Sequence, residues 1–409
     1  MRGTIAVLIA TVAVISCGAL PRTSTTSPIA NTSPTASPSA SPTAFPTASP
    51  SPPTNPASIP KLSGVYGLLY SSPDSGSTGI LHLVNADASL AASVPMSWNQ
   101  VGVLCSGRLD GVDNVPPVSA TDGHVYFREG ETIRMVIPPS SAVDVTKVPD
   151  SSSVMSFFSV RPDDQRIAVV VVDVSSPTTV TTRLYVEDLF GGGHHSEIYS
   201  ASATKGQNPL TLWPMGWHQG NLVLAVVHAC IFSLTEPPTE WHVSNATTAT
   251  RVATIKGSGC VMSTWPSPAG VACADNMGAT TLYDWGGKAV AATGPGIVTG
   301  PGIQIVGSNT ALSPAGKSIF FSNGRVGPGS ATRIVQLGPG PYATVQDHAA
   351  CGWIDEDHLL STDAVITFHA ETPGNLQMTA VVTPLPGSAL PAQSTPGSSS
   401  CAGRFPGGL

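Results

Sequence analysis

The residues best suited to acid–base or metal chemistry are ten scattered histidines and a few acids that lie close together. His194 and His195 form the only adjacent histidine pair, and they follow three glycines. Neither an HExxH motif nor a CxxC pair is present, although metal centres usually draw three or four ligands from such spacings. A histidine pair in a loop binds metal adventitiously more often than functionally. We therefore predict no metal site and no cofactor.

Four aspartates are the remaining candidates for catalysis, and all lie at predicted turns. Asp163 and Asp164 share one turn, whereas Asp355 and Asp357 share another with Glu356 and His358. The second cluster has the composition of a cation site, but its position in a repeated turn favours a solvated corner. No GxSxG elbow is present, and nothing in the sequence shows that the four acids converge. We assign no catalytic residue, and a binding protein is favoured over an enzyme.

Cys17 lies in surroundings that point to a definite covalent modification. Arg2 precedes an apolar run over residues 4–15, which is the layout of a secretory signal and too short to span a bilayer. Val14-Ile15-Ser16-Cys17 resembles the bacterial lipobox. That resemblance implies a lipoprotein signal peptide over residues 1–16, lipid on Cys17, and anchoring to the outer face of the cell membrane. The alternative is an ordinary signal peptide that is cleaved near Ala19.

Six further cysteines fit an exported chain, because disulfides persist in oxidising compartments. They are Cys105, Cys230, Cys260, Cys273, Cys351 and Cys401. Six cysteines allow 15 pairings, and spacing suggests only one of them, Cys260 with Cys273. The other pairings stay open.

Residues 17–60 join the lipidated cysteine to the folded part and consist almost wholly of Ser, Thr, Pro and Ala. Such a composition buries too little apolar surface to offset the entropy lost on ordering, so we predict a disordered tether. An extended tether of this length reaches on the order of 130 Å at most. The whole chain has a net charge of −7, and this excludes the basic footprint that a nucleic-acid partner requires.

Residues 61–386 contain a loose repeat of turns and short β-branched strands. The turn centres lie near residues 122, 163, 219, 269, 315 and 355. Intervals of about 40 to 56 residues with about four strands per unit indicate an all-β propeller. Residues 65–96 supply a seventh unit that lacks an innermost strand, so seven blades are favoured over six if the C-terminal region lends that strand. Two stacked sandwiches are the alternative. Residues 387–409 are predicted to form a tail, which Cys401 could pin to the ring.

Three segments also resemble the repeat of TolB-like and WD40-like propellers. Residues 161–172 and 313–321 are similar to its "SPDGKRIAF" segment, and residues 184–189 with the following glycines match its "LYVxDLxGG" segment. The resemblance implies that the first segment forms the turn between the two inner strands of a blade and that the second forms the third strand. Asp164 and Ala315 depart from the pattern, which expects Gly and Asp there.

Seven tryptophans remain to be assigned. Trp98, Trp217 and Trp353 each precede a polar turn and an apolar strand, which favours packing between blades over contact with a ligand. Together these features predict a lipid-anchored, extracytoplasmic propeller that binds or scaffolds a protein or glycan ligand. The alternative is a secreted propeller enzyme, a hydrolase or lyase of cell-wall or other polysaccharide.

Overall fold

The structure, a computed structural model, describes the folded part of the chain with several gaps. The described residues are 60–62, 64–71, 78–97, 118–207, 209–229, 238–256, 262–263, 266–275, 279–293, 309–322, 329–337, 342–369, 379–387, 399–402 and 409. They all belong to one compact unit, Pro50–Leu409. Cys17, the predicted signal peptide and nearly all of the predicted tether lie outside the described residues.

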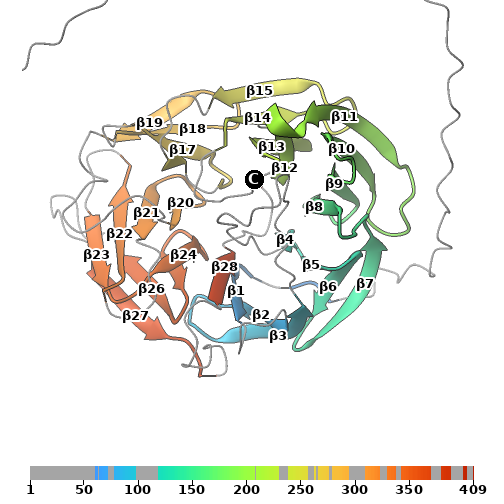
Figure 1. The fold of residues 1–409 in the computed structure, drawn as a ribbon. Coiled ribbons are helices and arrows are strands. Elements are labelled where there is room, and N and C mark those ends of the chain that lie inside the picture. Colours follow the sequence, from blue (N-terminus) through green and yellow to red (C-terminus); the bar gives the residue numbers. More distant parts are fainter. Residues whose placement is uncertain are drawn as a thin grey trace, which may run out of the picture. The chain divides into compact units, whose positions relative to one another are not determined.

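The described strands form seven four-stranded antiparallel sheets, which are arranged as the blades of a propeller (Figure 1). Blade 1 contains β1 (Gly67–Ser71), β2 (Thr78–Val84), β3 (Leu90–Ser97) and β28 (Ser399–Ala402). Blade 2 contains β4 (Val118–Ala120), β5 (Val125–Glu129), β6 (Thr132–Ile137) and β7 (Ser141–Lys147). Blade 3 contains β8 (Val154–Val160), β9 (Arg166–Asp173), β10 (Thr179–Asp188) and β11 (Ser196–Thr204).

The other four blades follow in chain order. Blade 4 contains β12 (Leu210–His218), β13 (Asn221–His228), β14 (Glu240–Ser244) and β15 (Arg251–Lys256). Blade 5 contains β16 (Met262–Ser263), β17 (Val271–Ala274), β18 (Thr280–Tyr283) and β19 (Ala289–Thr293). Blade 6 contains β20 (Asn309–Leu312), β21 (Ser318–Ser322), β22 (Ala331–Gln336) and β23 (Tyr342–Gln346). Blade 7 contains β24 (Ala350–Trp353), β25 (His358–Ser361), β26 (Ala364–His369) and β27 (Thr379–Pro384).

Helix is nearly absent from the described residues. The one helical element among them is the short 3-10 turn η2 (Lys205–Gln207). Within the same residues, no helix has the length and apolar character that crossing a membrane requires.

The prediction of seven blades is confirmed, and the six-bladed and sandwich alternatives are excluded. The ring closes because β28 pairs antiparallel with β1 and supplies the innermost strand of blade 1. This strand lies in the C-terminal region, within residues 387–409, which were predicted to form a tail. The two ends of the folded chain are thereby joined in one sheet.

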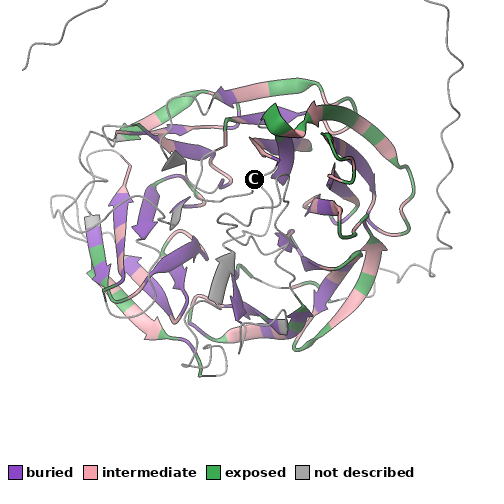
Figure 2. Ribbon diagram, viewed as in Figure 1, coloured by how far each residue is buried: buried purple, intermediate pink, exposed green. Residues whose placement is uncertain are grey.

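Seven apolar clusters hold the ring together, and each lies between two neighbouring blades. One cluster joins blades 1 and 2, and the next two join blades 2 and 3 and blades 3 and 4. The remaining four join blades 4 and 5, 5 and 6, 6 and 7, and 7 and 1. Figure 2 shows the consequence, with buried inner strands and partly exposed outer strands such as β7, β11 and β15.

Strand β9 shows why the sequences of the inner strands are continuous apolar runs. Ile167, Val169 and Val171 belong to the cluster with blade 2. Ala168, Val170 and Val172 point to the opposite face of the sheet and belong to the cluster with blade 4. Because successive side chains of a strand alternate between faces, a strand that is buried on both faces must be apolar at every position.

Two tryptophans add directional bonds to these apolar contacts. Trp217 on β12 donates its indole N–H to the main-chain oxygen of Ser159 on β8, at 3.2 Å. Trp353 on β24 donates in the same way to Ala311 on β20, at 2.9 Å. Each bond joins the inner strand of one blade to that of the preceding blade, so these tryptophans serve the packing of blades, as predicted.

Substitution of Trp353 tests the dependence of the ring on these junctions. Trp353 is fully buried and packs against Phe320 and Phe368. We expect Trp353→Ala to lower the free energy of unfolding by about 3–5 kcal/mol, because it leaves a large cavity between blades 6 and 7. Trp353→Phe keeps most of the apolar contact and should cost about 1–2 kcal/mol. Denaturant unfolding measures both losses. Equal losses of stability in the two variants would contradict the view that the aromatic side chain stabilises the junction by filling space between the blades.

Candidate functional site

The most concentrated set of polar side chains among the described residues lies between blades 2 and 3. Asp164, in the turn between β8 and β9, accepts hydrogen bonds from Thr121 Oγ1 at 2.6 Å, His124 Nδ1 at 2.8 Å and Tyr126 Oη at 3.0 Å. The three donors come from the end of β4, the following turn and β5. Asp164 thus joins one blade to the next through a buried carboxylate.

The backbone of the turn places this carboxylate. Asp164 has a φ of +60°, in the left-handed region that favours glycine, and the repeat that this turn resembles has glycine at this position. Its N–H donates to the main-chain oxygen of Arg161, which closes the turn. Aspartate is one of the few side chains that tolerate this conformation, so the turn keeps its shape and gains a side chain that reaches blade 2.

The surroundings of Asp164 favour its ionised form. Burial raises the pKa of the carboxyl, but the hydrogen bonds from His124 and Thr121, with a smaller one from Tyr126, outweigh burial and leave the pKa below its usual value. Burial and the charge of Asp164 raise the pKa of Tyr126, which stays a neutral donor. The carboxylate is therefore held as an acceptor.

His124 is the member of this set with unused bonding capacity. Its ring is 4% exposed, and its Nε2 has no hydrogen-bond partner among the described residues. Since the ionised Asp164 can only accept, Nδ1 of His124 carries a proton in this hydrogen bond. A small pocket with a cavity volume of about 10 Å³ adjoins the ring and is lined in part by Tyr66, Asp122 and His124. The pocket therefore has room for about one water beside this nitrogen.

A second carboxylate makes a similar bridge between blades 6 and 7. Glu356, in the turn between β24 and β25, accepts hydrogen bonds from Ser313 Oγ and from the N–H of Ala315, both at 2.8 Å. Ser313 ends β20 as Thr121 ends β4, and each hydroxyl lies 43 residues before its carboxylate partner. The turn carboxylate is therefore a repeated junction between blades.

The structure does not bring the four predicted acids together. Asp163 is exposed, accepts from the N–H of Gln165, and lies next to the buried Asp164. Asp355 accepts from the N–H of Asp357 and from His358 Nδ1, within its own turn. The first pair belongs to blade 3 and the second to blade 7, so whole blades separate them in either direction around the ring.

His194 and His195 make two separate hydrogen bonds, one with Asp188 and one with Glu187. The Nδ1–oxygen distances are 2.6 Å and 2.7 Å. Burial raises the pKa of Glu187 despite the bond from His195. No group of three or more His, Cys, Asp or Glu among the described residues has the arrangement to hold a metal ion.

The predicted covalent sites are described only in part. Cys17, Cys105, Cys230 and Cys260 lie outside the described residues. Cys273 lies on β17 and Cys351 on β24, and the main chain of Cys401 lies on β28 opposite Leu69. Lipidation of Cys17 and the pairing of Cys260 with Cys273 stay predictions.

Five of the seven tryptophans are described, and all five are buried: Trp213, Trp217, Trp241, Trp285 and Trp353. Trp98 and Trp265 lie outside the described residues.

Sequence reasoning named Asp164 but missed its partners. Thr121 and His124 stand in a predicted turn, where polar residues are ordinary. One sequence signal could have found Thr121. A hydroxyl residue after an inner strand lies 43 residues before an acid of the next repeat, both in Thr121–Asp164 and in Ser313–Glu356.

Comparisons with known proteins agree with the fold and go no further. The sequence matches no protein-family model and no curated protein. The solved structures that resemble it include a complex of KlAtg21 with the coiled coil of AgAtg16, at 10% identity and a TM-score of 0.43 over 79% of this chain and 100% of the other.

Two bacterial structures are similar to the same degree. A "putative 6-phosphogluconolactonase" from Bacteroides fragilis shares 12% identity, with a TM-score of 0.42 over 78% of this chain and 96% of the other. The dipeptidyl peptidase 4 of Porphyromonas gingivalis shares 9% identity, with a TM-score of 0.41 over 76% of this chain and 50% of the other. This chain thus spans half the length of that peptidase.

Asp164 provides a test of the junction between blades 2 and 3. Asp164→Ala leaves Thr121, His124 and Tyr126 without their acceptor, so we expect the free energy of unfolding near neutral pH to fall by about 3 kcal/mol. Asp163→Ala is the matched control and should change it by less than about 0.5 kcal/mol, because that side chain is exposed.

The pH dependence of this loss has a defined sign. The folded-state pKa of Asp164 is below its usual value of 3.8, so the unfolded state binds more protons in acid. Its contribution is full above about pH 4 and is lost as the pH falls through the folded-state pKa. The difference in the free energy of unfolding between wild type and Asp164→Ala should therefore narrow in acid. A constant difference would contradict an ionised acceptor.

Proposed function

We propose that the protein is an extracytoplasmic binding or scaffolding module, tied to the cell membrane by lipid on Cys17. The observation that carries the binding role is the use of the turn carboxylates. Asp164 and Glu356 are satisfied by hydrogen bonds from the preceding blade. Acids held in this way brace a rigid ring and are not free for proton transfer, so the turns favour a scaffold over a catalytic site.

The anchor rests on the sequence alone. A short apolar run, a small residue before Cys17 and an uncharged Ser/Thr/Pro segment over most of residues 18–60 are the features of a lipidated, tethered domain. A chain held to a membrane by lipid gains from a long extended segment, because the segment lets the folded part reach ligands away from the surface.

Disulfide bridges and membership of the TolB-like group belong to the same proposal. The turn at Arg161–Arg166 and the strand β10 occupy the places that the TolB-like repeat implies for them. A bridge between β24 and β28, through Cys351 and Cys401, would secure the closure of the ring.

Replacement of Cys17 tests the anchor. We expect Cys17→Ala to move the protein from the membrane fraction to the soluble fraction or to leave an uncleaved precursor, because the lipid acceptor is gone. Fractionation and intact-mass measurement give the readout, with Cys273→Ala as a cysteine control that should stay in the membrane. Unchanged partition and mass in Cys17→Ala would overturn the proposal of a lipoprotein.

Incubation of the full chain with isolated cell-wall polysaccharide and with surface proteins tests the binding role. We expect saturable retention on one ligand class, without new reducing ends and without unsaturated sugar products. Product formation that is lost in Asp355→Asn or Asp357→Asn would contradict the binding role and establish the polysaccharide hydrolase or lyase instead.

A further inference from the structure

His82 on β2 is deeply buried, with 1% of its surface exposed, and hydroxyl groups hold both of its ring nitrogens. Ser71 Oγ on β1 lies 2.9 Å from Nε2, and Ser93 Oγ on β3 lies 2.9 Å from Nδ1. A neutral imidazole has one donor and one acceptor nitrogen, so one serine accepts from the ring and the other donates to it. His82 thus joins three strands of blade 1 through one chain of side-chain hydrogen bonds.

This chain of hydrogen bonds lies in the blade that closes the ring. His82 stands opposite Leu69 in the pairing of β1 with β2, and Leu69 packs in the apolar cluster between blades 7 and 1. Ser71 stands opposite Ser399 of β28, the strand that completes the blade from the C-terminal region. The imidazole therefore lies on the face of blade 1 that blade 7 covers, near the closing contact.

The surroundings of His82 on this face favour the neutral ring. The cluster between blades 7 and 1 consists of apolar residues and Cys351. His358 points to the same side of β25 as Leu360 of that cluster, and it is bonded to Asp355. Burial lowers the pKa of His82. The other described acids of blades 1 and 7 lie in turns: Asp87, Glu356, Asp357 and Asp363.

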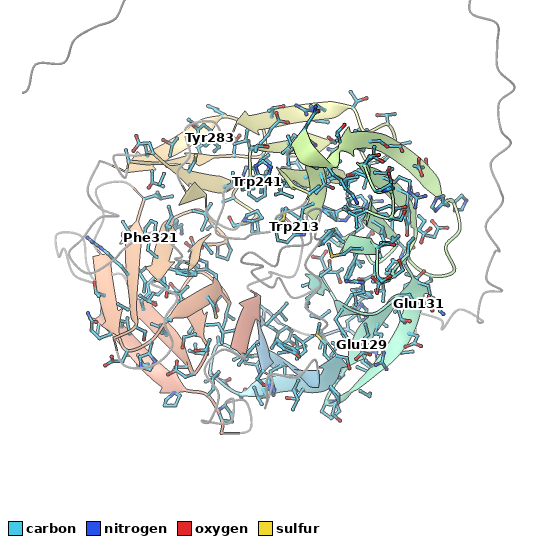
Figure 3. All side chains as sticks on the ribbon, in the orientation of Figure 1. Glu129, Glu131, Trp213, Trp241, Tyr283 and Phe321 are labelled. Atoms are coloured by element: carbon cyan, nitrogen blue, oxygen red, sulfur yellow. The ribbon has the colours of Figure 1, made fainter. Side chains whose placement is uncertain are left out.

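Blade 2 covers the opposite face of blade 1 and carries charged residues. Its acids Glu129 and Glu131, labelled in Figure 3, are bonded to basic side chains of the same blade. Leu81 and Leu83, the neighbours of His82 along β2, belong to the cluster with blade 2. Because successive side chains of a strand alternate between faces, His82 points away from blade 2 and its acids.

We propose that the Ser71–His82–Ser93 chain is an acid-sensitive latch on the closure of the ring, and that its ligand is a proton. With a neutral imidazole, the chain ties β1 to β2 and β3. Protonation places a charge among apolar side chains, where the hydroxyls in contact with the ring carry no charge to offset it. Hydration of that charge requires blades 7 and 1 to separate. Strand β28, which stands at the end of its sheet and pairs with β1, is then released.

Acid weakens the latch because the open junction binds the proton more tightly than the closed one. The closed-state pKa of His82 is below its usual value of 6.5. Its contribution to closure is therefore full above about pH 6.5 and is lost as the pH falls toward the closed-state pKa. Over that range, the equilibrium constant for opening rises by up to about tenfold for each pH unit. This proposal goes beyond the binding role and does not depend on it.

Hydrogen exchange of main-chain amides in the purified full chain, at about pH 7.5 and about pH 5.5, tests the latch. The rates are corrected for the intrinsic dependence of exchange on pH. We expect the protection of the β1 amides to fall by about threefold or more in acid, because the junction opens there first. The amides of β9 in blade 3 should keep their protection.

His82→Asn removes the titrating ring but keeps a side chain that can donate and accept. In this variant, the protection of β1 should no longer depend on pH. His242→Asn is the matched control, since His242 on β14 is also buried and burial also lowers its pKa. That variant should keep the acid response of β1, because its histidine lies in blade 4.

Imidazole NMR of the wild type gives a measurement that needs no variant. The ring of His82 should stay neutral below pH 6.5, and its protonation should coincide with the loss of protection in β1. An equal acid response in β1 and β9 would overturn the latch, as would an unchanged response in folded His82→Asn. None of these measurements needs the lipid on Cys17 or a bound ligand, so failure here leaves the proposed anchor and binding role standing.

Discussion

Every blade of this ring is apolar on both faces, and the rest of the structure depends on that constraint. A four-stranded sheet of this kind cannot be stable alone, because each face needs a neighbouring blade to cover it. Seven clusters cover the faces in turn, and the last joins blade 7 to blade 1. The ring of clusters closes only if blade 1 has all four of its strands. Strand β28, from the other end of the chain, supplies the fourth. Closure is therefore a global condition.

Hydrogen bonds between blades fix how neighbouring blades are aligned, which apolar contact alone does not. Apolar surfaces slide past one another at little cost, whereas a hydrogen bond to a buried group fixes both distance and direction. Asp164 and Glu356 each take a hydroxyl from the preceding blade, and Trp217 and Trp353 each give an N–H to it. Aspartate and glutamate are common catalytic residues, but these two carboxylates hold neighbouring blades in alignment. This use of the two acids supports the proposed scaffold role more directly than composition does.

The sequence predicts the features that repeat locally and misses those that depend on distant partners. Turn spacing predicts the blades, and β-branched runs such as that of β9 predict strands buried on both faces. The pattern does not say that Asp164 is buried while Asp163 is exposed, since both stand in one polar turn and only the backbone at φ +60° directs Asp164 toward blade 2. The contact of Leu409 with His218 joins residues 191 positions apart, and no local signal marks it.

The inner strands connect these observations to function. Among the described residues, the first strand of each sheet stands at the end of its sheet and lies toward the interior of the ring (Figure 1). On β12, Gly216 leaves room for the side chain of Leu409, and the N–H of Leu409 donates to the main-chain oxygen of Trp217. A ring braced by the carboxylates of Asp164 and Glu356 gives the inner strands a fixed position. Rigid presentation lowers the entropy lost on binding, so this architecture suits the binding role proposed here.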